Sequence, residues 1–142
     1  MKIYKHHKKT ALKARLVKKI TDIPETEWKS IYPDVLENYG FFKTLDESNL
    51  DQFAMRYVII YDRKTPIAAT TFFLLNYSLD TSINGPLRRV TNAITKRFPN
   101  IFSIKAVVCG MPIGEGRIGS IGQKDAVMEV ILRKLEQTAR KN

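Results

Sequence analysis

The residues best suited to chemistry form a glycine-rich stretch, CGMPIGEGRIGSIG, at positions 109–122. It holds five of the seven glycines in the chain: Gly110, Gly114, Gly116, Gly119 and Gly122. An apolar run at 102–110 precedes it, and a helical pattern that ends near Ala139 follows it. Backbone N–H groups at such a strand-to-helix turn are open to an anion, and the helix dipole favours negative charge there. The sequence therefore predicts a turn that binds phosphate or a developing oxyanion.

Two nucleotide-binding motifs match parts of this stretch. GEGRIG at 114–119 fits the dinucleotide fingerprint G-x-G-x-x-G, but MPI separates it from the strand, and no second strand with a ribose-binding acid follows. Gly114 and Gly119 have the P-loop spacing, but Ser120 stands where the P-loop requires lysine. The P-loop interpretation fails, and a dinucleotide site stays open as a weaker alternative.

Other residue types that do chemistry are scarce. The single cysteine, Cys109, excludes an internal disulfide, fits a reducing compartment and is typical of a small buried residue at a strand end. The two histidines, His6 and His7, are adjacent in a lysine-rich segment, which does not indicate a zinc site or a Cys-His pair. We expect no metal, and no catalytic residue is assigned.

The charge balance points to anionic partners. The 142 residues carry a formal net charge of +10, and residues 1–13 form a basic tail. RNA, anionic lipid headgroups or a phosphorylated cofactor would each suit this balance. There is no apolar run of about 18 residues and no signal-peptide pattern. We therefore expect a cytoplasmic protein without a transmembrane segment, for which peripheral membrane contact stays open.

Periodicity and turn residues predict the elements that position the glycine-rich stretch. They indicate a strand at 14–20, followed by helices at 23–33 and 45–53. A β-hairpin comes next, with the arms FAMRYVIIY and PIAATTFFLL, and then a loop at 76–85. The chain continues with a helix at 86–98, a strand at 102–110 and a last helix to about 139. Because the hairpin is almost continuously apolar, both faces of its strands should be covered. This order predicts one α/β domain over residues 14–142, with a mixed, mainly antiparallel sheet flanked by helices.

Three helices carry more specific expectations. At the start of the helix at 45–53, Asp46 or Ser48 is available as the cap. Ser120 and Gln123 fit a capping box at the start of the last helix, which would turn Val127, Val130, Ile131 and Leu135 inward. The helix at 86–98 has an apolar stripe and a basic face with Arg88, Arg89, Lys96 and Arg97. That face is either a solvated charge run or a phosphate-binding surface.

The element order and three segments resemble the GNAT-type N-acyltransferases. The segments are ITDIPETEWKSIYP, YVIIYDRKTPIAATTFFLL and KAVVCGMPIGEGRIG, and they are most similar to the Fem-like proteins often labelled as peptidoglycan biosynthesis or recognition proteins. The resemblance covers roughly residues 14–140, and within it Met111 replaces the Gln or Arg of the family's pyrophosphate loop. It implies a partial GNAT-like domain, incomplete at its C-terminus, because GNAT domains continue with strands that complete the acceptor site.

The resemblance also implies an activity and a donor site. Fem-like proteins transfer an aminoacyl group from charged tRNA to an amine on a cell-wall precursor. For this chain the GNAT-like, Fem-like resemblance therefore implies transfer of an acyl or aminoacyl group from acyl-CoA or aminoacyl-tRNA to an amine. Backbone groups of Val108, Cys109 and Gly110 would line the acyl carbonyl. The donor's phosphates would lie on the following turn, which contains Gly114, Glu115, Gly116, Arg117, Ile118, Gly119 and Ser120. Arg117 could pair with phosphate or be a surface cation, and Glu115 could be a base or a solvated carboxylate.

Two classes of function follow from these patterns. The first is an N-acyltransferase or its donor-binding part, which a second chain could complete by pairing with the strand at 102–109. On that interpretation the isolated chain should bind a donor weakly and turn over little. The second is a non-catalytic basic module that binds RNA or an anionic surface.

Overall fold

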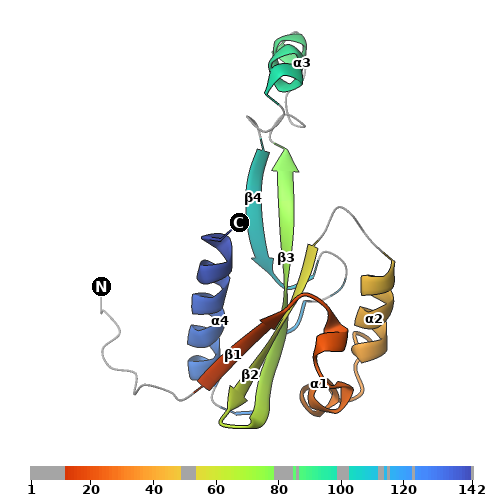
Figure 1. The fold of residues 1–142 in the computed structure, drawn as a ribbon, viewed down its shortest axis with the longest axis vertical. Coiled ribbons are helices and arrows are strands. Elements are labelled where there is room, and N and C mark those ends of the chain that lie inside the picture. Colours follow the sequence, from red (N-terminus) through yellow and green to blue (C-terminus); the bar gives the residue numbers. More distant parts are fainter. Residues whose placement is uncertain are drawn as a thin grey trace, which may run out of the picture.

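The computed structural model describes residues 12–48, 54–78, 85, 87–98, 103–111, 114, 116–122 and 124–141. Four strands form a sheet in the order β1 (Leu12–Val17), β2 (Ala54–Asp62), β3 (Thr65–Ser78) and β4 (Ser103–Cys109), as Figure 1 shows. A short fifth strand, β5 (Gly119–Ser120), also pairs with β3, and all of these pairings are antiparallel. The predicted α/β fold with a mainly antiparallel sheet is confirmed.

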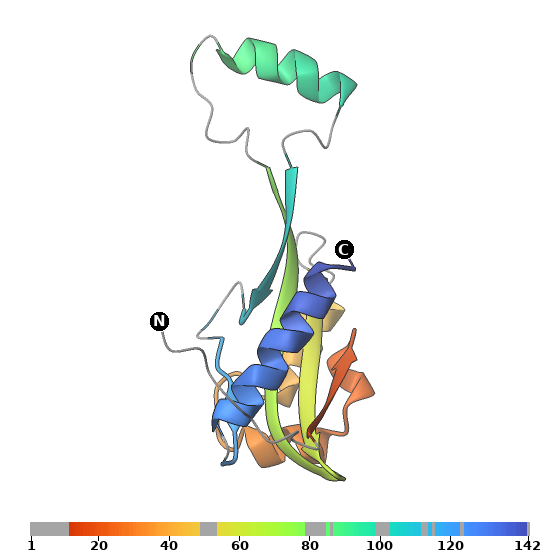
Figure 2. The ribbon, with the colours of Figure 1, turned by 90° about the vertical axis from the view of Figure 1, so that its left-hand side faces the viewer.

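The helices lie on both faces of this sheet and at one end of it. Helices α1 (Glu25–Ile31) and α2 (Tyr39–Glu47) cover one face, and α4 (Lys124–Ala139) covers the other (Figures 1 and 2). A one-turn helix, η1 (Ile20–Asp22), connects β1 to α1. Helix α3 (Leu87–Arg97) lies beyond the far end of the ribbon formed by β3 and β4, away from the other helices.

Alternate residues of β2 build a core on each face of the sheet. Tyr57 and Ile59 are fully buried on the side of α1 and α2. Val58 and Ile60 are fully buried on the opposite side, in the cluster that contains Val127 of α4. The second cluster also holds Ile131, with Val130 and Leu135 packed against it, as the sequence predicted. Two covered faces explain the nearly continuous apolarity of the hairpin.

An aromatic cluster fixes α1 and α2 on the sheet. The ring of Trp28 lies 5.1 Å from Tyr32, 5.4 Å from Phe42 and 6.0 Å from Tyr57, measured between centroids. The last two contacts are edge-on, the geometry that the ring quadrupole favours. Trp28 is therefore a core residue.

The second helix begins earlier than the sequence predicted. We expected it at 45–53 with Asp46 or Ser48 as its cap, but α2 spans Tyr39–Glu47 and residues 49–53 lie outside the described part of the chain. Its cap is Asn38, whose side-chain oxygen accepts a hydrogen bond from the N–H of Phe41 at 3.0 Å. The carboxylate of Asp46 instead accepts from the N–H of Ile20 and the hydroxyl of Tyr57. Tertiary contacts therefore override the local capping signal.

Two further expectations were wrong. The segment 76–85 was predicted as a loop, but Asn76–Ser78 continue β3, opposite Ser103–Lys105 of β4. Ser120 was predicted to cap the last helix, but it lies in β5, and α4 begins only at Lys124. The Ser120 hydroxyl donates to the carbonyl of Gly122 at 2.9 Å, and Gln123 lies outside the described residues. Pairing with β3 therefore replaces the expected capping box.

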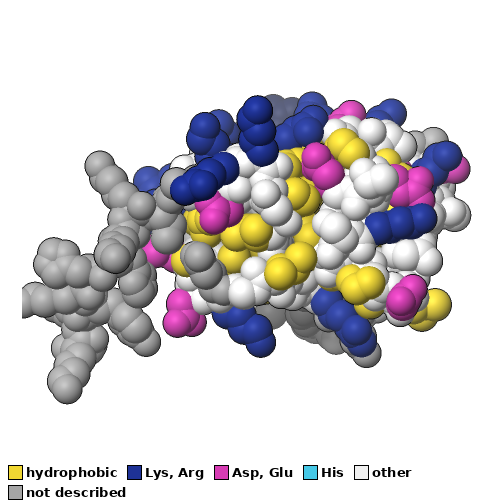
Figure 3. Space-filling view, turned by 90° about the horizontal axis from the view of Figure 1, so that it is seen from below, with side chains coloured by type: hydrophobic (Ala, Val, Ile, Leu, Met, Phe, Trp, Pro, Cys, Tyr) yellow, Lys and Arg dark blue, Asp and Glu magenta, His cyan; other side chains and the backbone are white. Residues whose placement is uncertain are grey.

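The end of the molecule opposite α3 has a mixed surface. Figure 3 shows Lys and Arg side chains there interspersed with Asp and Glu side chains and with small apolar areas. Such a surface is typical of a solvated face.

Candidate functional site

The glycine turn, defined here as residues 110–118, leaves the sheet and returns to it at almost the same place. Cys109 ends β4 opposite Phe72, and the N–H of Gly110 donates to the carbonyl of Thr71 at 2.8 Å. The hydroxyl of Thr71 donates to the carbonyl of Gly110 at 2.7 Å. After the turn, Gly119 pairs opposite Ala69 of the same strand. The two ends of the turn are thus held on β3 with only Thr70 between them.

The hydroxyl of Tyr32 holds the returning end of the turn. It accepts a hydrogen bond from the N–H of Gly119 at 2.8 Å. The carbonyl oxygens of Ala69, at 2.6 Å, and Arg117, at 2.8 Å, are both within reach of its single proton. This side chain therefore ties the end of α1 to the turn and to β3.

Burial keeps this hydroxyl protonated. Tyr32 is only 8% exposed, and desolvation raises its pKa far above the ordinary value of 10.0, although the hydrogen bond from Gly119 acts in the opposite direction. A neutral hydroxyl can donate and accept at once, which this position requires.

The turn folds back on itself through two glycines. Gly116 has φ +58°, and a Cβ atom there would lie 2.9 Å from the Cα of Gly110 and from the amide nitrogen of Met111. Gly114 has φ +106°, and a Cβ atom there would collide with the carboxylate of Glu37. Only glycine combines this backbone conformation with such close approach. The glycines are therefore required by the shape of the turn.

The middle of the turn contains backbone N–H groups that are available to a ligand. Among its described residues, the amides of Gly114, Gly116 and Ile118 make no hydrogen bond, whereas those of Gly110 and Gly119 are engaged at the two ends. The dipole of α4 does not act directly on these amides, because β5 and the Ile121–Gly122 segment lie between the turn and the start of α4. The amide of Ile121 donates to the carbonyl of Ile67 at 2.7 Å.

The other predicted donor-site residues lie within the turn or next to its ends. Val108 and Ile118 are each 37% exposed, and Arg117 is exposed. Cys109 is half-buried, with its Sγ atom 3.6 Å from the hydroxyl oxygen of Thr70. Ser120 lies on β5, and Glu115 lies outside the described residues. Val108, Cys109, Gly110, Gly116 and Arg117 thus belong to one region at the end of β4.

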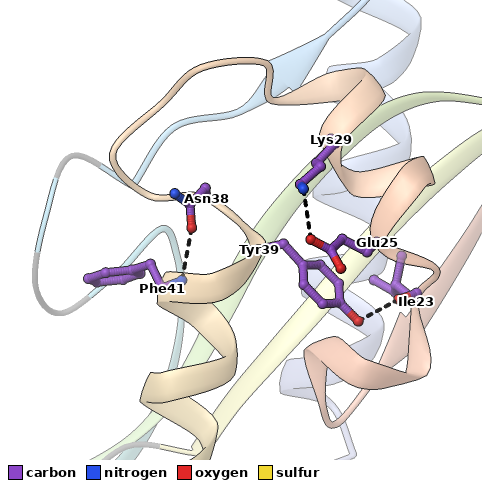
Figure 4. A network of polar contacts seen from close by, with 6 residues as sticks. All are labelled: Ile23, Glu25, Lys29, Asn38, Tyr39 and Phe41. Atoms are coloured by element: carbon purple, nitrogen blue, oxygen red, sulfur yellow. Dashed lines mark hydrogen bonds and ion pairs between the residues drawn. The ribbon is translucent and has the colours of Figure 1, made fainter.

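A pocket of about 490 Å³ opens between α1 and α2 next to this region. Tyr32 lines it, and so do Glu25, Lys29, Asp34 and Asn38. Figure 4 shows Lys29 and Glu25 facing each other from neighbouring turns of α1, with 2.8 Å between the Nζ and Oε1 atoms, and Asn38 at the start of α2. Because Tyr32 also holds Gly119, the pocket and the glycine turn share one side chain.

Two residues of the site were not predicted. Tyr32 and Glu37 lie at the end of α1 and in the connection to α2, far along the chain from the turn they contact. Nothing in their local sequence marks them, because neither belongs to a motif. Their role depends on the packing of α1 against β3.

The described residues contain no group of three His, Cys, Asp or Glu side chains placed as metal ligands would be. Within the same ranges, no helix is both long enough and apolar enough to cross a bilayer. Comparison of the chain with protein-family models, with curated proteins and with solved structures found no match.

Proposed function

We propose that this chain binds the phosphorylated carrier of an activated acyl group, as the donor-binding part of a GNAT-like, Fem-like N-acyltransferase. The observation that carries the proposal is the glycine turn, whose two ends are fixed on β3 while the amides of Gly114, Gly116 and Ile118 remain uncommitted. Hydrogen-bond donors that are already fixed in position before the reaction stabilise negative charge at little reorganisation cost. The resemblance of the sequence to acyltransferases supports the same interpretation.

The reaction transfers the acyl group to an amine nitrogen. The nitrogen lone pair attacks the carbonyl carbon of the thioester or ester and forms a tetrahedral intermediate with a negatively charged oxygen. The C–S or C–O bond then breaks, the nitrogen loses one proton to a base, and the base passes that proton to the departing sulfur or oxygen, so that the carrier leaves as a thiol or hydroxyl. The protein must therefore orient the carbonyl, stabilise the oxyanion and accept that proton.

The described residues can fill these roles. The backbone at the end of β4, from Val108 to Gly110, would line the acyl carbonyl, and the amides of Gly116 and Ile118 with the Arg117 side chain would hold phosphate. In the pocket beside Tyr32, Glu25 is paired with Lys29, which leaves Asp34 as the carboxylate that would attract the acceptor amine. The carboxylate of Glu37 lies against Gly114, where it would accept the proton.

The finer identity of the reactants rests on the resemblance. Acyl-CoA and aminoacyl-tRNA are the two proposed donors, because both present phosphates next to an activated carbonyl. The proposed acceptor is an amine such as one on a cell-wall precursor, and the proposed location is the cytoplasm, where both donors occur. A second chain could complete the sheet along β4, whose outer edge pairs with no described strand.

Calorimetric titration of the chain with acetyl-CoA and, separately, with an aminoacyl-tRNA tests the donor site. Arg117→Ala should weaken binding about tenfold, since a charge-assisted hydrogen bond contributes about 1.5–3 kcal/mol, and Gly116→Val should abolish it by deforming the turn. Gly122→Ala is the matched control, because Gly122 also has a positive φ of +74° but nothing within 4 Å of an added Cβ atom. Titration with NAD tests the dinucleotide alternative.

A second pair of variants tests the contact between α1 and the turn. Tyr32→Phe removes the hydroxyl that holds Gly119, so donor affinity should fall. Tyr39→Phe removes a buried hydroxyl that donates only to the carbonyl of Ile23, at 3.0 Å, so donor affinity should persist. If RNA binds and only an Arg88→Glu/Arg89→Glu variant loses it, the chain is a basic binding module and the acyltransferase proposal is wrong.

A further inference from the structure

We infer that α3 docks on the surface of a bilayer that contains anionic phospholipid. This inference does not rest on the proposed transferase activity. Helix α3 lies at the tip of an arm formed by β3 and β4, which separates it from the layers around the sheet (Figures 1 and 2). An element in this position can approach a flat surface without hindrance from α1, α2 or α4.

The arm is strongly basic, and the segment 79–102 that joins β3 to β4 holds one acid, Asp80, against four basic residues. Between Asp80 and Glu115 the sequence contains no acidic residue, and its basic residues are Arg88, Arg89, Lys96, Arg97 and Lys105. The side chains of Lys96, Arg97 and Lys105 are exposed. By contrast, the opposite end of the molecule carries both signs intermixed (Figure 3). Anionic headgroups would therefore be attracted to the arm more than to that end.

The apolar residues of α3 follow one stripe. Leu87, Val90, Ile94 and Phe98 recur at intervals of three or four, which places them on one side of a helix. The N–H of Phe98 donates to the carbonyl of Ile94 at 2.8 Å, so the helical geometry continues to Phe98, whose side chain is 59% exposed. An exposed aromatic residue beside two exposed cations is costly in water and favourable at a headgroup boundary.

The same stripe favours a bilayer over a nucleic acid. RNA that binds through its phosphates would contact the cations, but it would make few contacts with a row of apolar side chains. A bilayer surface uses both, since the apolar side enters the acyl boundary while Lys and Arg remain at the headgroups. Helix α3 thus has the composition of an interfacial helix.

Vesicle sedimentation with the full chain tests the inference. The chain should bind vesicles of phosphatidylcholine with phosphatidylglycerol, should bind pure phosphatidylcholine vesicles poorly, and should dissociate as salt is raised. Lys96→Glu/Arg97→Glu should lower the partition coefficient at least about twenty-five-fold, because each lost cation contributes about a factor of five. The matched control is Lys43→Glu/Lys64→Glu, which makes the same charge change at two exposed positions on the body and should have little effect.

The apolar stripe requires its own variants. Phe98→Ser should lower vesicle binding about tenfold or more at unchanged charge. Phe98→Trp should keep binding and show a blue-shifted emission with anionic vesicles, against a constant background from Trp28, which is fully buried. Binding to tRNA that needs Lys96 and Arg97, without binding to anionic vesicles, would overturn the inference. Vesicle binding that is indifferent to Phe98→Ser, or equally sensitive to the body control, would overturn it as well.

Discussion

At the scale of single residues, Tyr32 and Gly116 do the most to shape the glycine turn. The hydroxyl of Tyr32 accepts from the amide of Gly119 and lies within hydrogen-bond distance of two carbonyl oxygens. Gly116 lets the chain pass directly over Gly110. Tyr32 thus fixes the end of the turn through hydrogen bonds, and Gly116 permits the close backbone contact within the turn. Neither contact is between neighbours in the sequence.

Replacing Gly116 with Ala should destabilise the protein more than replacing Gly122. Both residues have positive φ, for which alanine costs about 1–2 kcal/mol. Only at position 116 would the added Cβ atom lie 2.9 Å from the backbone of Gly110 and Met111. Urea denaturation of both variants measures the difference. Equal losses in the free energy of unfolding would mean that the turn is not tightly packed at Gly116.

The buried tyrosines predict a loss of stability in alkali. Burial raises the pKa of Tyr32 and of Tyr57 well above 10.0, and the hydrogen bond to Asp46 raises the pKa of Tyr57 further. Below pH 10 both states keep these protons, so the contribution to stability is constant. Above it the unfolded chain loses them and the folded chain does not. The free energy of unfolding should therefore fall by about 1.4 kcal/mol per pH unit for each tyrosine.

Urea denaturation at a series of alkaline pH values, with tyrosinate absorbance recorded in parallel, measures this effect. In Tyr57→Phe the decline with pH should be less steep, because one of the tyrosines with a raised pKa is gone. Ionisation of all tyrosines near pH 10 in the folded protein would contradict the prediction.

At the scale of elements, β3 organises the site. It is 14 residues long, and on one edge β2 pairs with it from Thr65 to Leu74. On the other edge β4 pairs from Phe72 onward and β5 pairs at Ala68 and Ala69. The glycine turn fills the interval between β4 and β5. A single strand therefore determines where the turn begins and ends.

The cap of α2 can be tested separately. Asn38→Ala removes the acceptor for the N–H of Phe41 and should lower the free energy of unfolding by about 1 kcal/mol. Asn38→Ser should retain most of the stability, because serine also caps helices well. Thermal or urea denaturation of the two variants measures the effect. An unchanged midpoint in Asn38→Ala would show that packing of Tyr39 and Phe42 alone holds this helix.

At the scale of the whole molecule, the body and the arm are built differently. The body has a core on each face of its sheet, whereas the arm extends from it as two strands that carry α3 (Figure 1). Among the described residues, the buried apolar clusters therefore lie in the body. The arm contributes mainly an extended basic surface.

Replacing residues 79–102 with an Asn-Gly turn should leave the body folded. Ser78 and Ser103 lie opposite each other, so a two-residue hairpin turn can join them. We expect the free energy of unfolding to change by less than about 1 kcal/mol, while binding to anionic vesicles is lost. Urea denaturation and vesicle sedimentation measure the two effects. A loss of cooperative unfolding would show that the arm is part of the folding unit.

Much of the fold could be predicted from the sequence, because several signals are local or periodic. The nearly continuous apolarity of the hairpin predicted a sheet covered on both faces, and the spacing in α4 predicted which of its residues pack inward. The clustering of glycines predicted a turn at the end of β4. The start of α2 was missed because Gly40 and two adjacent aromatic residues obscure its helical pattern.

The sequence alone thus determined the kinds of elements, the faces they bury and the place of the glycine turn, since each depends on residues close together in the chain. Tertiary structure alone decided that Gly119 and Ser120 pair with β3 as a strand, that Tyr32 holds the turn and that Glu37 lies against Gly114. These contacts join segments distant in the sequence. They form only when α1 packs on the sheet, because hydrogen-bond geometry depends on positions in space and not on spacing along the chain.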